Sequence, residues 1–115
     1  MSDESDFGAL ADRVLQAIGK ALDAADADAD WTLNDGVLTI DCGAMGKLIV
    51  NRHLPSREIW VAAKSGGFHF RASDGAWRDT RDGSVLGAAL ARLLRSQALI
   101  VVDFGNLPVP PHAPA

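Results

Sequence analysis

The chain has 115 residues, 48% of them hydrophobic and 23% charged, with a formal net charge of −4, which together are typical of one globular domain with one core. No apolar run approaches the roughly 20 residues that a membrane-spanning helix needs, and the acidic start MSDESDFG lacks the apolar stretch of a signal peptide. The single cysteine, Cys42, excludes an internal disulfide and is typical of a reducing compartment, so we expect a cytoplasmic protein that binds no membrane.

The first predicted element is an amphipathic helix. Its apolar side chains recur at intervals of three and four residues and form one stripe: Phe7, Leu10, Ala11, Val14, Leu15, Ile18 and Leu22. Asp12 and Asp23 both fall on its polar side, roughly 16 Å apart at a rise of ~1.5 Å per residue. The two carboxylates therefore cannot share one metal ion, and cations bound along this helix would be spread over a ridge.

An acidic run, DAADADAD, follows at residues 23–30, and residues 1–30 carry a formal charge of −6 against +2 for residues 31–115. Such a run is often only a solvated face. However, carboxylates at a helix C-terminus oppose the helix dipole, and in an extended segment Asp26, Asp28 and Asp30 would project to one side about 7 Å apart. A cation would relieve both repulsions, with iron, manganese, magnesium and calcium all open. The acidic end favours cations or a basic partner protein over nucleic acid, which requires a clustered basic surface.

From Trp31 the apolar period changes to two, which predicts a series of strands. The predicted strands span residues 31–34, 37–42, 47–52, 58–64, 68–72 and 76–79. Asp35-Gly36 between the first two is a strong hairpin signal. Since the other loops are also too short for crossover helices, the pattern predicts an antiparallel meander.

A second helix is predicted to start at Ser84 as its N-cap. Its expected buried face consists of Val85, Leu86, Ala89, Leu90, Leu93 and Leu94. Residues 100–104 alternate like a last strand, and the proline-rich residues 105–115 are expected to form a disordered tail. We therefore expect a single domain over residues 1–104.

This order of elements predicts an α+β fold, a two-layer sandwich whose antiparallel sheet carries the N- and C-terminal helices on one face. The other sheet face would be open to solvent or to a partner. Alternation directs Ile59 and Val61 toward the helices and Glu58, Trp60 and His69 outward. An outward tryptophan is typical of an interface anchor, although most strand tryptophans simply pack.

The sequence contains no recognisable catalytic constellation, so we expect no enzyme. It has no zinc-ligand spacing, no glycine-rich phosphate loop and no nucleophile elbow. His53, His69 and His112 are expected to be surface or loop histidines, because none has a partner at ligand spacing. Cys42 is expected to be a small buried hydrophobe.

The stretch NRHLPSREIWVAAKSGGFHF, residues 51–70, closely resembles the central signature of the frataxin family in its bacterial CyaY form. In that signature an Asn-Arg pair leads through a proline loop into an Ile-Trp strand, followed by a Gly-Gly turn and an aromatic-His-Phe strand. The segments FGALADRVLQAIGKALD and NDGVLTID are similar to the family's first helix and first hairpin. The resemblance covers roughly residues 5–104.

The resemblance implies a helix–sheet–helix sandwich and an accessory protein of iron–sulfur cluster assembly. It implies that iron, Fe²⁺ or Fe³⁺, is held weakly and exchangeably by an acidic ridge. The ridge residues here would be Asp12, Asp23, Asp26, Asp28 and Asp30. Through Asp23 and Asp26 the ridge would also meet a basic surface of the cysteine desulfurase, while Asn51 and Trp60 on the open sheet face would contact the assembly machinery, including its scaffold protein.

In one place the sequence departs from the family pattern. Gly19 and Lys20 stand where bacterial relatives commonly carry two acids, which thins the ridge and concentrates the expected iron binding toward residues 23–30. The alternative is a protein-interaction module whose ridge recognises a basic partner and binds metal incidentally. We expect a monomer that iron could drive to oligomerise. Whether it accelerates or restrains cluster formation stays open at this point.

Overall fold

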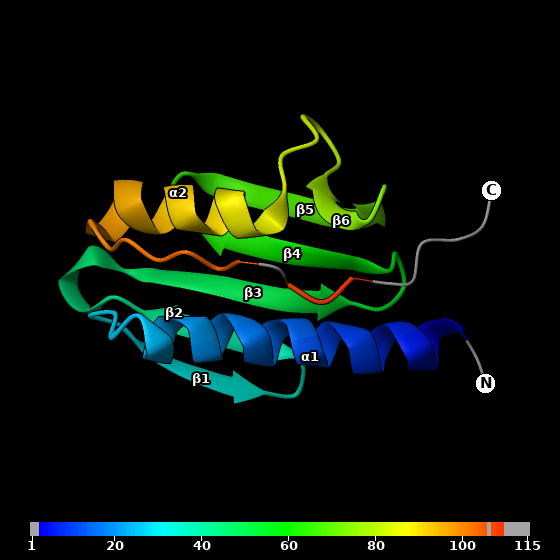
Figure 1. The fold of residues 1–115 in the computed structure, drawn as a ribbon, viewed down its shortest axis with the longest axis horizontal. Coiled ribbons are helices and arrows are strands. Elements are labelled where there is room, and N and C mark those ends of the chain that lie inside the picture. Colours follow the sequence, from blue (N-terminus) through cyan, green and yellow to red (C-terminus); the bar gives the residue numbers. More distant parts are fainter. Residues whose placement is uncertain (1–2, 106, 110–115) are drawn as a thin grey trace.

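The computed structural model describes residues 3–105 and 107–109. Helix α1 spans Asp3–Ala24 and helix α2 spans Leu86–Ala98. Between them lie strands β1 Asp30–Asn34, β2 Val37–Asp41, β3 Lys47–His53, β4 Glu58–Ala63, β5 Gly66–Ser73 and β6 Ala76–Asp79, with a 3-10 turn at Gly43–Met45 before β3. The strands form one antiparallel sheet in the order β1-β2-β3-β4-β5-β6, and both helices lie on one of its faces (Figure 1). The predicted α+β sandwich is confirmed.

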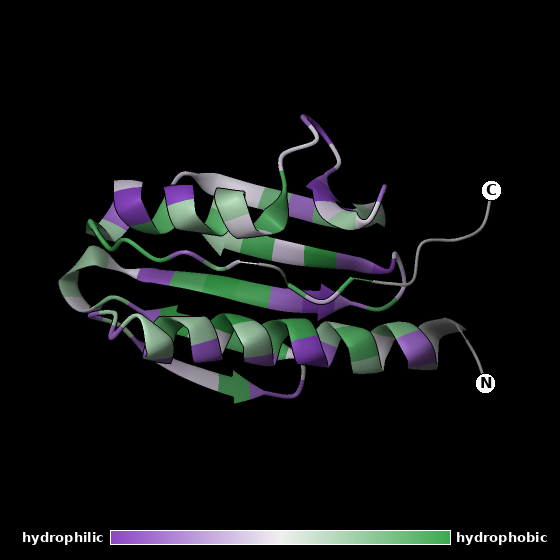
Figure 2. Ribbon diagram, in the orientation of Figure 1, coloured by the Kyte–Doolittle hydropathy of each residue, from purple (hydrophilic) through white to green (hydrophobic). Residues whose placement is uncertain are grey.

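Helix α1 is amphipathic, and Figure 2 shows hydrophobic and hydrophilic residues alternating along it. Every residue of its predicted apolar stripe is buried, and from Ala11 to Ile18 the stripe is fully inaccessible. Helix α2 buries Leu86, Ala89, Leu90, Leu93 and Leu94, whereas Val85, which was also predicted on the buried face, is exposed. Neither described helix is long and apolar enough to cross a membrane.

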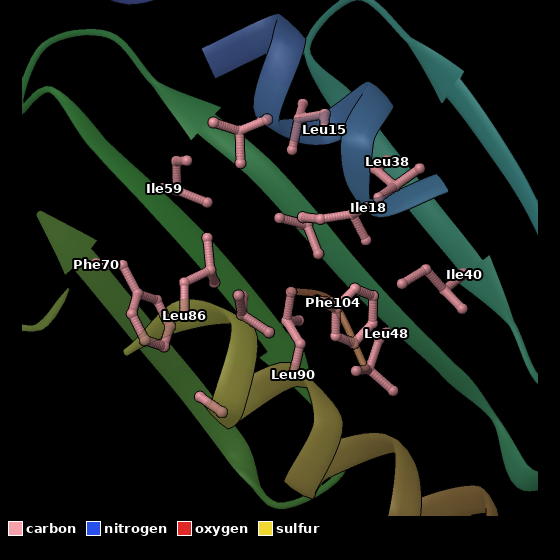
Figure 3. Packing of buried hydrophobic residues seen from close by; sticks show 14 of the residues in the cluster. Leu15, Ile18, Leu38, Ile40, Leu48, Ile59, Phe70, Leu86, Leu90 and Phe104 are labelled. Atoms are coloured by element: carbon pink, nitrogen blue, oxygen red, sulfur yellow. The ribbon is translucent and has the colours of Figure 1, made fainter. Parts of the chain in front are cut away.

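The core lies between the helices and the sheet (Figure 3). Leu15 and Ile18 of α1 and Leu90 of α2 point toward the sheet, where strand residues such as Ile59 and Phe70 meet them. The apolar face of each strand is therefore the one that faces the helices, as the alternation of the sequence predicts. At about 25 cal/mol per Å² of apolar surface, this burial is the main force that holds the two layers together.

The chain after α2 differs from the prediction. Residues 100–104 pair with no strand in the described part of the chain, so the predicted last strand is wrong. Their alternation instead reflects one-sided burial, because Ile100, Val102 and Phe104 are inserted into the core while Val101 is 75% exposed. The segment runs between α1 and α2 (Figure 1) and acts as a third covering element of the helical layer.

Packed structure continues beyond the predicted domain boundary at residue 104. Leu107 and Val109 pack against the core, and Trp77 Nε1 donates a hydrogen bond to the Pro108 carbonyl at 2.6 Å. Residues 110–115 of the predicted tail, including His112, lie outside the described residues.

Two local predictions are also corrected. The N-cap of α2 is Val85 and makes no side-chain cap, whereas Ser84 accepts a backbone hydrogen bond from Asp79 through its carbonyl. Strand β5 begins at Gly66, which pairs with Ala63, so the β4–β5 turn is shorter than the sequence suggests. This register decides which side chains meet on the open face of the sheet.

The role of residues 100–104, which we call the closing segment, can be tested with Phe104→Ala. We expect the free energy of unfolding to fall by about 3 kcal/mol, because the substitution removes a buried ring. Val101→Ala is the matched control in the same segment, with an expected change below about 0.5 kcal/mol. Urea unfolding followed by circular dichroism measures both, and equally small effects would show that the segment is no part of the core.

Candidate functional site

The carboxylate of Asp12, the first member of the predicted acidic ridge (Asp12, Asp23, Asp26, Asp28 and Asp30), is held by an arginine. Arg52 of β3 reaches α1 and places Nη1 at 2.9 Å from Asp12 Oδ1 and 2.7 Å from Oδ2. The Arg52 side chain crosses Gly36 in the β1–β2 turn, where a Cβ would collide with it and where φ is +77°. Both oxygens of Asp12 are thus engaged, and this ion pair joins the helix to the sheet.

Asp23, in the last turn of α1, is also engaged within the protein. Its Oδ1 accepts a hydrogen bond from Trp31 Nε1 at 3.0 Å. The Trp31 indole lies on α1 at Gly19, where a Cβ would come within 2.6 Å of the ring. Gly19 therefore makes room for the tryptophan that connects β1 to the helix.

Asp26 terminates α1 in the left-handed conformation, with φ 51°. The Ala27 amide bonds to the Leu22 carbonyl and the Asp26 amide to the Asp23 carbonyl, both at 3.0 Å, which is the Schellman pattern. Residues 26–30 still alternate between exposed aspartates and half-buried alanines, as predicted. However, the turn at Asp26 means that the three aspartates do not form one extended row.

Asp28 and Asp30 instead share a cleft with Asp41, which was not among the predicted ridge residues. This acidic cleft, about 420 Å³ in volume, is lined by Asp28, Ala29, Asp30, Asp41, Cys42, Gly43 and Ala44. Asp30 and Asp41 are direct cross-strand partners of β1 and β2, and like charges in that position repel. A signal for Asp41 was present, since a two-residue turn at Asp35-Gly36 pairs residue 30 with residue 41.

Cys42 lies in the wall of the acidic cleft, close to its carboxylates. Burial raises the pKa of the Cys42 thiol, and the charges of Asp41 and Asp28 raise it further. Cys42 is buried, as predicted. Among the described residues, no group of three or more His, Cys, Asp or Glu side chains is arranged to hold a metal ion. The cleft therefore offers separate carboxylates and not a preformed multidentate site.

The open sheet face carries a stack of three rings across β3, β4 and β5. Trp60 lies between His53, at a centroid distance of 3.8 Å and an angle of 12°, and His69, at 4.2 Å and 10°. His69 is the cross-strand partner of Trp60. Trp60 faces outward as predicted, but it is half-buried within this stack, so the two histidines fix its orientation.

Glu58 lies beside the stack on the open face, as the alternation predicted, and its neighbours bury it there. Its carboxylate accepts hydrogen bonds from Trp60 Nε1 at 2.9 Å, Ser56 Oγ at 3.1 Å and Arg71 Nη2 at 2.8 Å. Burial raises the pKa of Glu58, but the hydrogen bonds from Trp60 and Ser56 and the charge of Arg71 outweigh it, so the pKa is lowered overall. This network is not visible in the sequence, because it joins side chains from three separate segments.

Asn51, the other residue predicted to contact a partner through the open sheet face, is the cross-strand neighbour of Trp60. Its Oδ1 atom is buried and accepts no hydrogen bond in the described part of the chain. An unpaired buried acceptor costs about 1–3 kcal/mol. Asn51 and Trp60 are thus brought together on the open face, away from the acidic ridge.

The amino-acid sequence is similar to those of known proteins. The sequence profile of the Frataxin-like domain matches residues 1–99. The iron-sulfur cluster assembly protein CyaY of Dechloromonas aromatica is 50% identical over 97 residues, covering 84% of this chain and 92% of that protein. The protein of the same name from Paraburkholderia xenovorans is 48% identical over 104 residues, covering 90% and 98%.

Solved structures share the fold. Frataxin from Psychromonas ingrahamii has a TM-score of 0.83 at 31% identity, covering 91% of this chain and 100% of that one. A trimeric frataxin from Saccharomyces cerevisiae, complexed with ferrous iron, has a TM-score of 0.64 at 27% identity, covering 86% and 88%.

The structural role of Asp12 can be measured with a double-mutant cycle of Asp12→Asn and Arg52→Gln. We expect a coupling energy of about 0.5–1 kcal/mol, because the pair is only partly exposed. The control cycle combines Arg52→Gln with Asp35→Asn, since Asp35 is 94% exposed and lies 3.8 Å from Arg52. Its coupling should be close to zero, and equal couplings in the two cycles would contradict a specific role for Asp12.

Glu58 should contribute to the acid sensitivity of the fold. Because its pKa is below the ordinary 4.5 in the folded state, its stabilisation is present above about pH 4.5 and is lost as the pH falls through the lowered pKa. Glu58→Gln should therefore be less stable at pH 7 and lose less stability between pH 5 and pH 3 than the parent protein. Asp74→Asn, at an exposed turn, is the control. A parent-like decline in Glu58→Gln would contradict the assignment.

Proposed function

The chain belongs to the frataxin family, and we propose that it serves iron–sulfur cluster assembly as a non-catalytic accessory protein that binds iron weakly and docks on a cysteine desulfurase and its scaffold. The role in assembly is supported by relatives of that name at 50% and 48% identity. The binding of iron is supported by the yeast frataxin of related fold that was solved with ferrous iron.

The observation that carries the proposal is the acidic cleft. Asp28, Asp30 and Asp41 bring three exposed carboxylates to one corner of the molecule. A cation bound there would relieve the repulsion between the paired Asp30 and Asp41. Carboxylate and water oxygens suit a hard cation that exchanges readily. We therefore propose that one or two of these carboxylates, together with waters, hold the iron.

The remaining ridge residues take different parts in this proposal. Asp26 is exposed at the end of α1, beside the acidic cleft, and extends its negative surface. Asp12 and Asp23 are engaged by Arg52 and Trp31 and serve mainly to position α1 and β1. Iron binding is thus concentrated at the corner formed by residues 26–30 and Asp41, close to the stretch that the sequence favours.

The same corner would attract a basic surface of the desulfurase. Four aspartates between residues 23 and 30 lie at the surface with no basic residue among them. Complementary charge of this kind accelerates association and fixes orientation more than it adds affinity. Iron and the desulfurase would consequently compete for, or share, one acidic surface.

The open sheet face is proposed as the contact with the rest of the machinery, including the scaffold. The three-ring stack holds Trp60 in one orientation, so little entropy is lost when a partner covers it. A donor from the partner could also pair with the Asn51 amide after a side-chain rotation. A tryptophan fixed in this manner has the properties of an interface hot spot.

The second candidate is a protein-interaction module in which metal binding is incidental. It is favoured by the lack of a preformed metal-ligand group in the described residues and by the ordered Trp60 stack. In either case we propose a cytoplasmic protein that is a monomer until iron drives it to oligomerise. A yeast frataxin has been solved as a trimer.

An anaerobic Fe²⁺ titration followed by amide NMR tests the iron site. We expect line broadening confined to residues 26–31 and 41–44, and its loss in the triple variant D28N/D30N/D41N. The matched control is D35N/D74N/D82N, which removes the same charge from three exposed residues outside the cleft and should keep the broadening. Absent or uniform broadening in the parent protein would contradict the site.

The two candidate functions are separated by Trp60→Ala. We expect this variant to bind the cognate desulfurase–scaffold complex at least about tenfold more weakly, as for an interface hot spot, while the iron-induced broadening is unchanged. Cluster-assembly rates measured with and without added iron then decide between them. Rates that depend on this protein equally at every iron concentration would favour the interaction module.

A further inference from the structure

A larger cleft, of about 790 Å³, lies beside the first half of α1. It is bounded by the early turns of α1, by the β3–β4 turn and by the β5–β6 hairpin. Its lining includes Phe7, Arg13, Ser56, Arg57, Arg71 and Trp77. This arginine cleft plays no part in the function proposed above. Arg71 also takes part in the Glu58 network beside Trp60, whereas Arg13 and Arg57 belong neither to the acidic ridge nor to the Asn51–Trp60 surface.

The floor of the arginine cleft is apolar and rigid. The rings of Phe7 and Trp77 meet edge to face, with centroids 5.9 Å apart and an angle of 72°. Leu10 adjoins them, and all three side chains are buried in the core. Trp77 is also fixed from behind by its hydrogen bond to Pro108. The base of the cleft is therefore hydrophobic.

The rim of the cleft is basic. Arg13, Arg57 and Arg71 line it, and Asp6 is the one acid among the described lining residues, in a chain whose net charge is −4. Arg71 bonds to Glu58 through Nη2 but remains 62% exposed. Since a guanidinium has five N–H donors, the bond to Glu58 leaves Arg71 able to bind a second anion.

We propose that the arginine cleft binds a small organic anion: a carboxylate or phosphate group carried on a flat apolar body. Guanidinium groups match the geometry of both anions, and the Phe7–Trp77 floor fits the apolar body. The volume lies within the range of about 300–1,000 Å³ that is usual for small-molecule sites. Arginines from three separate elements line one cleft with an apolar floor, which distinguishes this cleft from a generally basic surface.

Phenyl phosphate is the probe for the test, with binding to the full chain followed by amide NMR. We expect saturable shifts at residues 6–13, 56–57 and 71–72. Benzoate should shift the same amides, and the tighter of the two identifies the preferred anion. Inorganic phosphate lacks the apolar body and benzyl alcohol lacks the charge, so both should bind more weakly. Shifts that do not saturate, or that map elsewhere, would overturn the proposal.

Arg13→Gln and Lys20→Gln form a matched pair of variants. Both residues are exposed on α1, and a spacing of seven residues puts them on the same helix face about 10 Å apart. Arg13→Gln should weaken phenyl phosphate binding about two- to fivefold, as expected for an exposed charge pair, while Lys20→Gln leaves it unchanged. Equal weakening in both variants, or equal affinity for phenyl phosphate and inorganic phosphate, would show only non-specific charge attraction and would overturn the site. The readout involves neither iron nor a desulfurase, so its failure is distinct from failure of the proposed function.

Discussion

Both helices and the closing segment bury the same face of the sheet, and the remaining architecture depends on this one-sided packing. Because strand side chains alternate, every second residue of the sheet is committed to a face that no described element covers. Polar groups on that face bond either to water or to one another. Glu58 shows the second case: it is 6% exposed without any help from a helix, because Trp60 and Arg71 both bond to its carboxylate and Arg71 neutralises its charge. The open face is therefore an ordered surface, with its tryptophan held in place before any partner arrives.

The same packing explains why fewer carboxylates of the acidic ridge are open to a cation than the sequence suggests. Helix α1 is fastened to the sheet at two points along its polar side, by Arg52 to Asp12 and by Trp31 to Asp23. Each fastening uses a carboxylate that would otherwise be open to a cation. Gly19 belongs to the second fastening, since the indole ring occupies the space of its missing side chain. What looks in sequence like a lost ligand is a packing requirement, and the carboxylates without such contacts are those past the end of the helix.

The sequence was sufficient where one local rule decides the outcome. The helical stripe from Phe7 to Leu22 and the hairpin at Asp35-Gly36 follow from periodicity and turn chemistry, and the hairpin register even contains the pairing of Asp30 with Asp41. It was insufficient where contacts are distant. Nothing local predicts that Arg52 reaches Asp12, forty residues away. The alternation in residues 100–104 indicates only that one side of the segment is buried. A strand and an irregular covering segment produce the same alternation. The sequence alone therefore cannot tell the two apart, and the packing beside α2 decides between them.

Helix α1 also separates two clefts of opposite charge, although its dipole opposes that placement of the charged side chains. The arginine cleft lies along its first half and the acidic cleft follows its C-terminus, so the partial charges at the helix ends add to the field of each. Arg13 and Ala24 are roughly 16 Å apart along the axis at ~1.5 Å per residue, which is about two Debye lengths at physiological ionic strength. Charge bound at one cleft is thus largely screened from the other. Any coupling between a cation at one end and an anion at the other must pass through the packing of α1 on the sheet, where Gly19, Trp31 and Arg52 hold the helix.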